Sequence, residues 1–213
     1  LDNWERDIIN IVREESMYFM PQAMTKIMNE GWASFWHYKI MSELDLPQEF
    51  HLSFLKFHNQ VLRPMVGRIN PYHLGFTIFK WIEENRGLEE CFIARASHND
   101  ESFIRTYLNK DICEDLNLFS YSKKKKEWTI DDISDEEGWK QIRADLIKNV
   151  GLNSLPNIYI RELQKDQTLV LEHEHDGRDL DLDYAHNVCD HLLDLWGDDF
   201  KFYTIIEEEP FEI

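Results

Sequence analysis

The amino-acid sequence predicts an α+β protein, in which an N-terminal helical region is followed by a small α+β domain with a mostly antiparallel sheet. Two patterns indicate this fold class. In the first half, apolar residues recur every three or four positions, as on the buried stripe of a helix. In the second half, short β-branched and aromatic runs joined by short connections alternate with amphipathic helices, which favours antiparallel strands with helices on one face.

The helical region is predicted to contain five helices. Pro21 is expected to end the first helix and begin the second, because proline suits the first turn of a helix. Asn70-Pro71 begins the fourth, since it combines a capping side chain with proline at the first helical position. The expected helices span residues 3–19, 22–44, 47–62, 71–84 and 99–116.

The second region is predicted to follow the order ββαββαβ. A run of lysines, Lys123 to Lys126, forms the tip of the first hairpin, and Ser134 begins a capping box for the first helix. Gly151 and Gly197 are expected to end the two helices. The expected strands are residues 118–121, 128–130, 158–160, 169–171 and 202–206.

The sequence predicts two domains, residues 1–98 and residues 99–213, that pack against each other. Charge divides the chain in a similar way. Residues 1–106 hold 11 basic and 15 acidic side chains, whereas residues 107–213 hold 12 and 26. The acidic surface therefore belongs mainly to the C-terminal domain, which we expect to be the docking surface for a protein partner.

Composition excludes several classes of protein. A net charge of −18 argues against nucleic-acid binding, which requires a basic patch, and no apolar run approaches the ~18 residues of a membrane span. The three cysteines, Cys91, Cys113 and Cys189, have no paired spacing, which is typical of a reducing, cytoplasmic compartment. The chain begins with Leu1 instead of Met, so we expect a fragment or a processed product.

No common nucleotide-binding, hydrolase or metalloprotease motif is present, so the sequence assigns no catalytic residue. The main candidate polar site is formed by two predicted helices. Glu30 and His37 are seven residues apart and share one face of a helix, as do His51 and His58 on the next. If the two helices form an antiparallel hairpin, Glu30 lies nearer to His58, and His37 nearer to His51.

A glutamate and a histidine that meet across two helices can form a metal or acid–base site, with Glu30 and His58 as the metal ligands. The alternative is a buried hydrogen-bond network without chemistry. The neighbouring Gly31 is costly inside a helix and indicates the close approach of another group.

A second, weaker metal candidate is the pair His173 and His175. On a strand, alternate side chains point to the same side about 7 Å apart, which is compatible with a metal ion. The alternative is an exposed acidic strand end, because Asp176-Gly177 is a turn signal.

Three segments resemble the stage V sporulation protein R (SpoVR-like) family. They are Trp4-Glu5-Arg6-Asp7-Ile8, the long run from Pro21 to Tyr38 that contains Asn29-Glu30-Gly31-Trp32, and Ile69-Asn70-Pro71-Tyr72-His73-Leu74-Gly75. The resemblance is sharp over residues 4–82 and looser beyond residue 99. The chain looks like the C-terminal portion of such a protein, with a further N-terminal region missing.

The resemblance implies a cytoplasmic bacterial protein that takes part in sporulation, in the formation of the spore cortex, without an established reaction. One hypothesis is a regulatory or interaction factor. Another is part of a zincin-like metal-dependent hydrolase, which would bind zinc or iron through Glu30 and His58 or His37, with further ligands in the missing region. A third is a purely structural helical domain that supports that region.

Overall fold

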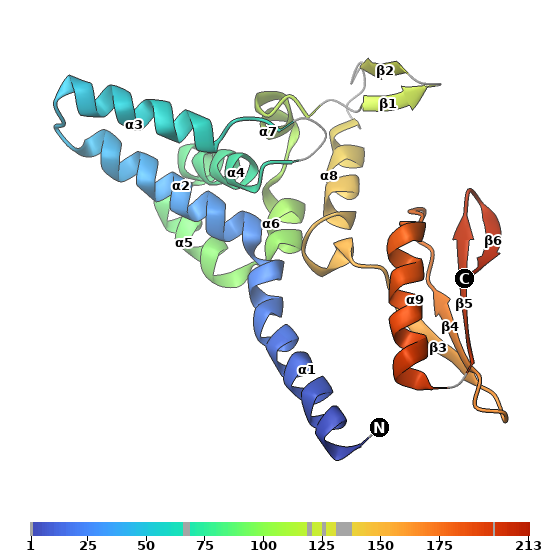
Figure 1. Ribbon diagram of the computed structural model, residues 1–213. Coiled ribbons are helices and arrows are strands. Elements are labelled where there is room, and N and C mark those ends of the chain that lie inside the picture. Colours follow the sequence, from blue (N-terminus) through green and yellow to red (C-terminus); the bar gives the residue numbers. More distant parts are fainter. Residues whose placement is uncertain (1, 66–68, 119–120, 125–126, 131–137, 198) are drawn as a thin grey trace. The chain divides into compact units, whose positions relative to one another are not determined.

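The computed structural model describes residues 2–65, 69–118, 121–124, 127–130, 138–197 and 199–213. The chain forms two compact units, a helical unit of Glu15–Ser154 and a C-terminal unit of Leu155–Ile213 with Leu1–Glu14. Helices make up most of the first part, and a small sheet with one helix makes up the end (Figure 1), which confirms the α+β class. The prediction that the chain has two domains, residues 1–98 and residues 99–213, stays a prediction.

In the described part of the chain, eight α-helices precede the strands of the four-stranded sheet, and a ninth lies between two of these strands. Their bounds are α1 Asn3–Met24, α2 Lys26–Glu43, α3 Gln48–Val61, α4 Pro71–Arg86, α5 Leu88–Ser97, α6 Asp100–Tyr107, α7 Lys110–Asp115, α8 Gly138–Lys148 and α9 Leu182–Trp196. A 3₁₀-helix, η1, spans Gly151–Ser154. Among the described residues, no helix is both long enough and apolar enough to cross a bilayer.

The predicted break at Pro21 is wrong, because α1 continues through it to Met24 and α2 begins at Lys26. The break falls at Thr25, where a distant carboxylate satisfies the start of the new helix. Asp100 of α6, 1% exposed, accepts hydrogen bonds of 2.9 Å from the backbone N–H groups of Ile27 and Met28. These donors have no partner within α2, so the acceptor from α6 fixes where the helix starts.

The predicted helix over residues 99–116 is two helices, and α5 before it was not predicted. Helix α6 ends at Tyr107, and Asn109 begins α7 by accepting a hydrogen bond of 3.1 Å from the backbone N–H of Ile112. The break follows from this capping side chain, which competes with a continuous helix. The predicted caps at Asn70 and Gly197 are confirmed.

The core of the helical unit is built around α4. Leu74, Ile78, Phe79 and Ile82 of this helix are at most 1% exposed, and they pack against buried residues of α2, α5, α6 and α7. The rings of Phe79 and of Phe103 of α6 pack against each other at a tilt of 38°, with centroids 4.8 Å apart. The packing holds α2 and α4 together, and these helices carry the candidate site.

The strands form two sheets. The hairpin pairs β1 (Tyr121–Lys124) with β2 (Glu127–Ile130), while the capping box at Ser134 lies outside the described residues. The larger sheet has the order β3-β4-β5-β6, with bounds Ile158–Leu163, Leu169–His173, Phe200–Ile206 and Glu209–Glu212.

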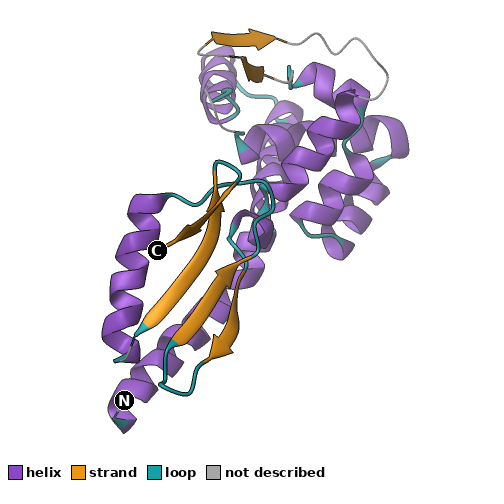
Figure 2. Ribbon diagram, turned by 90° about the vertical axis from the view of Figure 1, so that its right-hand side faces the viewer, coloured by secondary structure: helices purple, strands orange, loops and turns teal. Residues whose placement is uncertain are grey.

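This sheet is mixed, which corrects part of the prediction. Strands β3 and β4 are antiparallel, as are β5 and β6, but β4 and β5 are parallel. The reason is that β4 is joined to β5 through α9, and a helical crossover returns the chain in the same direction. Strand β6 was not predicted. Helix α9 packs on one face of the sheet (Figure 2), where Cys189 meets Leu171 of β4 and Phe202 of β5.

Candidate functional site

Helices α2 and α4 cross at two glycines, and this contact positions the candidate site. A β-carbon built on Gly31 would lie 2.4 Å from the Cα and the carbonyl carbon of Gly75, and one built on Gly75 would lie 2.3 Å from the carbonyl oxygen of Ile27. Side chains cannot approach a backbone so closely, so the crossing requires glycine on both helices. The close approach expected at Gly31 is therefore made by the backbone of α4.

Glu30, next to this crossing, is tied to the start of α4. The interaction of its half-buried carboxylate with the hydroxyl of Tyr72 raises the pKa of Tyr72. The α4 cap fixes Tyr72, because the Asn70 side chain accepts from the Tyr72 backbone N–H at 3.0 Å. The same side chain donates to the carbonyl oxygens of Val61 and Arg63 at 2.7 and 2.9 Å. The end of α3 and the start of α4 thus orient the partner of Glu30.

His58 of α3 is 5% exposed and is surrounded by aromatic rings. The ring centroids of Tyr38, Phe76 and Phe54 lie 5.0, 5.1 and 5.7 Å from its own. Burial, with a smaller effect from His37, lowers the pKa of His58, which favours the neutral imidazole. Its Nε2 has no hydrogen-bond partner. Every other buried side-chain nitrogen or oxygen of the described residues has one.

The two remaining histidines of the candidate site, His37 and His51, both lie near the ring of Phe54. Helices α2 and α3 form the predicted hairpin (Figure 1). The exposed His37 ring lies 5.2 Å from the ring of Phe54 and 6.5 Å from that of His58, and the His51 ring lies 6.2 Å from that of Phe54. The hairpin thus brings His37 close to His58, whereas Glu30 interacts with Tyr72 of α4. We refer to Glu30, His37, His58 and Tyr72 as the polar seam.

The polar seam offers one carboxylate and two imidazoles, which are common metal ligands. Across the described ranges, no group of three or more histidine, cysteine, aspartate or glutamate side chains is arranged to hold a metal ion. Glu30 is oriented by Tyr72, as a ligating carboxylate usually is by a second residue, and His58 has a free nitrogen. The residues present fit part of a ligand set, and a complete site would need further ligands.

An open pocket of about 220 Å³ lies beside the polar seam and shares Tyr38 and Phe76 with the surroundings of His58. Two ion pairs are found among its lining side chains. Lys39 lies 2.5 Å from Glu83, and Lys80 lies 3.8 Å from Glu84. Only the first pair joins α2 to α4, because Lys80 and Glu84 both belong to α4. A partly exposed ion pair contributes only ~0–1 kcal/mol, so it does not by itself hold α2 against α4.

The second candidate pair, His173 and His175, lies in the C-terminal unit with ring centroids 5.9 Å apart. Both imidazoles have partners. His173 Nδ1 is 2.9 Å from the hydroxyl of Thr204, and His175 Nε2 is 3.0 Å from a carboxylate oxygen of Asp179. The pair therefore takes part in hydrogen bonds that connect β4 to β5 and to the following turn.

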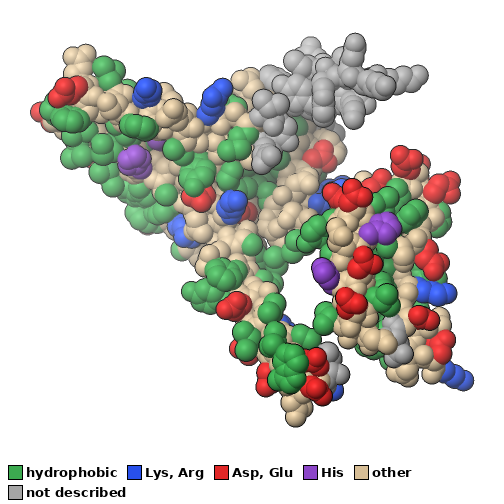
Figure 3. All heavy atoms as spheres, in the orientation of Figure 1, with side chains coloured by type: hydrophobic (Ala, Val, Ile, Leu, Met, Phe, Trp, Pro, Cys, Tyr) green, Lys and Arg blue, Asp and Glu red, His purple; other side chains and the backbone are tan. Residues whose placement is uncertain are grey.

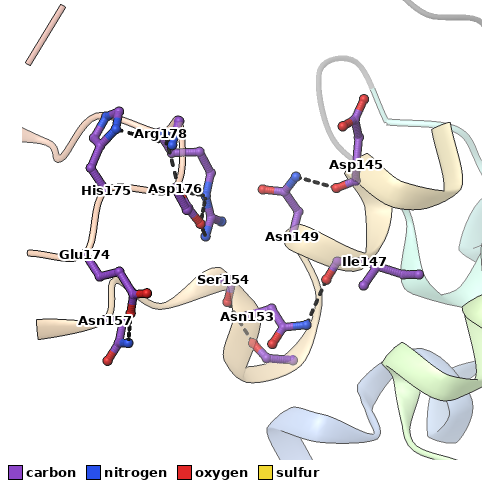
Figure 4. Close-up of polar contacts among 12 residues, drawn as sticks. Asp145, Ile147, Asn149, Asn153, Ser154, Asn157, Glu174, His175, Asp176 and Arg178 are labelled. Atoms are coloured by element: carbon purple, nitrogen blue, oxygen red, sulfur yellow. Dashed lines mark hydrogen bonds and ion pairs between the residues drawn. The ribbon is translucent and has the colours of Figure 1, made fainter. Parts of the chain in front are cut away.

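That turn, from His175 to Arg178, is held by an ion pair (Figure 4). The Nε atom of Arg178 is 3.0 Å from both carboxylate oxygens of Asp176. Hydrogen bonding to the guanidinium lowers the pKa of Asp176 to about 2. This agrees with the expected turn at Asp176-Gly177, and it keeps Asp176 negatively charged.

Sequence reasoning missed two residues that organise the helical unit. Tyr72 stands in the third segment that resembles the family, but nothing in that segment marks it as the partner of Glu30. Asp100 was not singled out, although it holds the start of α2. Neither contact can be predicted from neighbouring residues, because each joins residues more than 40 positions apart in the sequence.

Comparisons with known proteins cover the whole chain. Residues 1–155 match the family model described as SpoVR like protein, and residues 156–206 match that described as SpoVR-like C-terminal domain. The chain is 34% identical, over an alignment 247 residues long, to the "Uncharacterized protein YcgB" of Escherichia coli (strain K12). The alignment covers 100% of this chain and 48% of that protein, so the chain spans about half the length of the relative. No solved structure matches the chain.

Proposed function

The chain belongs to the SpoVR-like family, and on this basis we propose that it takes part in spore cortex formation as a cytoplasmic regulatory or interaction factor. Its C-terminal unit binds a basic protein partner through its acidic surface. The whole protein is longer than this chain if it resembles its relative, so the proposal concerns one part of a larger molecule.

The observation that supports this function is the concentration of negative charge. Residues 155–213 contain 16 acidic and only 4 basic side chains, a formal net charge of −12 in 59 residues. Many of the carboxylates are exposed, and they are spread over the face of the C-terminal unit shown in Figure 3. A field of one sign attracts a partner of opposite charge and repels like-charged molecules, which gives both speed and selectivity of association.

The proposal is tested by removing charge without changing shape. Five carboxylates of the C-terminal unit are changed to amides, and a control variant loses five exposed carboxylates of the helical unit. The test set is Glu162, Glu174, Glu207, Glu208 and Glu209. The control set is Glu43, Asp45, Glu49, Glu89 and Asp115.

Binding of a fluorescent peptide of alternating Lys and Val is measured by anisotropy at 50 and 200 mM salt. We expect the test variant to bind at least about fivefold more weakly than the control at 50 mM salt, and the difference to shrink at 200 mM, because salt screens exposed charges. Equal affinities of the two variants would contradict the proposal.

A second function, a metal-dependent hydrolase of the zincin type, is favoured by the polar seam. Glu30 is held by Tyr72, and His58 has a buried nitrogen without a partner, so Glu30 with His58 or His37 would supply part of a ligand set for zinc or iron. The remaining ligands would come from the part of the longer protein that lies outside this chain.

This alternative predicts a bound metal in the full-length protein. Zinc and iron are measured by mass spectrometry in the wild type, in Glu30→Gln and in a control, Glu83→Gln, which alters a carboxylate of α4 that pairs with Lys39. Loss of metal in Glu30→Gln alone would support the hydrolase. Equal metal content in all three proteins, or none in any, would exclude Glu30 as a ligand.

A further inference from the structure

The four-stranded sheet has two edge strands with different chemistry. In the described part of the chain, β3 pairs only with β4, and β6 pairs only with β5. The outer side of each strand therefore carries backbone groups without a strand partner. Such an edge can accept an additional strand unless the sequence prevents it.

Strand β6 is protected against an additional strand. Its four residues, Glu209-Pro210-Phe211-Glu212, include a proline, which has no N–H to donate, and two negative charges. Proline and charge are common means by which edge strands avoid pairing.

Strand β3 carries no proline and is rich in apolar side chains. All six of its residues are exposed, with Ile158, Tyr159, Ile160 and Leu163 between 44% and 68%. None of them belongs to the buried core of the unit, which is formed by β4, β5 and α9. The register is regular from Ile158 to Ile160, before a bulge at Arg161. The strand thus presents a short, regular, apolar edge.

The charges around β3 are suited to a basic segment. Its own cation, Arg161, lies 3.4 Å from Glu172 of β4 and 5.8 Å above the ring of Tyr203 of β5, so it folds back over the sheet and away from the outer edge. Two carboxylates lie on or next to the strand. Glu162 is exposed on β3 itself, and Glu174 is bonded to Asn157 next to its start.

We propose that β3 is the recognition strand of the C-terminal unit, to which an extended basic segment of a protein partner adds by backbone hydrogen bonds. This inference rests on the proposed function, because it names the place and the mode of partner binding. Strand addition supplies affinity through the main chain, and alternate side chains of the added strand supply selectivity. A second copy of this chain is disfavoured as the occupant, because two units of net charge −12 repel each other.

The test compares two substitutions that change the net charge equally. Ile160→Lys places a cation on the β3 edge, and Phe211→Lys places one on β6 at the opposite edge of the sheet. Both are made in the chain of 213 residues. The probe is the peptide of alternating Lys and Val, and the control probe alternates Lys and Pro, which has equal charge but lacks every second N–H.

We expect Ile160→Lys to weaken binding of the Lys-Val peptide at least about tenfold and Phe211→Lys less than about twofold, since only the first disturbs the pairing edge. The Lys-Pro peptide should bind at least about tenfold more weakly than the Lys-Val peptide to the wild type. Amide hydrogen exchange of residues 158–163 should slow when the Lys-Val peptide binds, and that of residues 209–212 should not.

Two results would overturn the inference while the proposed function stands: equal weakening by both substitutions, or equal affinity for both peptides. Either would mean that charge alone holds the partner. Failure of the wild type to bind either peptide at 50 mM salt would remove the proposed function as well. If the chain self-associates in sedimentation and Ile160→Lys abolishes this self-association, the occupant of the β3 edge is a second copy of the chain and not a basic partner.

Discussion

Gly31 and Gly75 meet backbone to backbone where α2 crosses α4, with no room for a side chain on either. A β-carbon on Gly31 would lie 2.4 Å from two backbone atoms of Gly75. The crossing places Glu30 beside Tyr72 and brings the two largest sets of buried side chains in the helical unit together. The polar seam depends on it.

The first prediction is that Gly31→Ala destabilises the protein. Helix propensity alone favours alanine over glycine by about 1 kcal/mol in a helix interior, so without the crossing the change would stabilise α2. With the crossing, the methyl group meets backbone that cannot move aside, and we expect a loss of about 1–3 kcal/mol in the free energy of unfolding. Urea denaturation followed by circular dichroism measures the sign of the change in the free energy of unfolding. A more stable variant would show that the helices do not touch here.

The second prediction concerns Asp100, which joins α6 to the start of α2. Asp100→Ala leaves the buried N–H groups of Ile27 and Met28 without an acceptor and should cost about 2–4 kcal/mol. Asp100→Asn retains one acceptor oxygen and should cost less.

The pH dependence of the Asp100→Asn variant tests the same contact. Burial raises the pKa of Asp100, so the native carboxyl keeps its proton to a higher pH than the unfolded one. The wild type therefore loses stability as pH rises through that raised pKa, and an asparagine does not. We expect the deficit of Asp100→Asn relative to the wild type to shrink between pH 4 and pH 7 in urea titrations. A deficit that grows with pH would show that the two hydrogen bonds stabilise the charged carboxylate by more than its burial destabilises it.

The third prediction concerns His58. Because burial lowers its pKa, the native imidazole stays neutral at a pH where the unfolded one is already charged. The wild type should lose stability as pH falls below about 6.5, the usual pKa of histidine. His58→Phe removes this titration and fills the same aromatic surroundings, so its stability relative to the wild type should rise from pH 8 to pH 5. Parallel stability curves of the two proteins would contradict the burial of a neutral imidazole.

Local signals in the sequence predicted much of the fold. The cap at Asn70-Pro71, the end of α9 at Gly197 and the stripe of apolar residues along α9 each depend on neighbours in the chain, so they can be read without tertiary structure. The errors came from contacts across the chain. The break between α1 and α2 lies at Thr25 because Asp100, 73 residues from Ile27, accepts its N–H. The parallel pairing of β4 with β5 likewise depends on how α9 crosses.

The candidate site was predictable as a set of residues but not as a geometry. Helical spacing predicted that Glu30 and His37 share a face, and Gly31 indicated a close contact. The partner of Glu30 could not be predicted, because Tyr72 lies on a third helix whose angle to α2 is fixed by Gly75. Spacing along one helix contains no information about such an angle.

An experiment in cells decides whether the protein acts by holding a partner with its acidic C-terminal unit. The full-length protein is expressed at matched levels in a spore-forming strain that lacks its own SpoVR-like gene, and cortex thickness is measured by electron microscopy. The variants are Glu30→Gln and the five-carboxylate variant of the C-terminal unit. We predict that Glu30→Gln restores a normal cortex and that the five-carboxylate variant does not. A thin cortex with Glu30→Gln and a normal one with the five-carboxylate variant would contradict it in favour of the metal-dependent hydrolase.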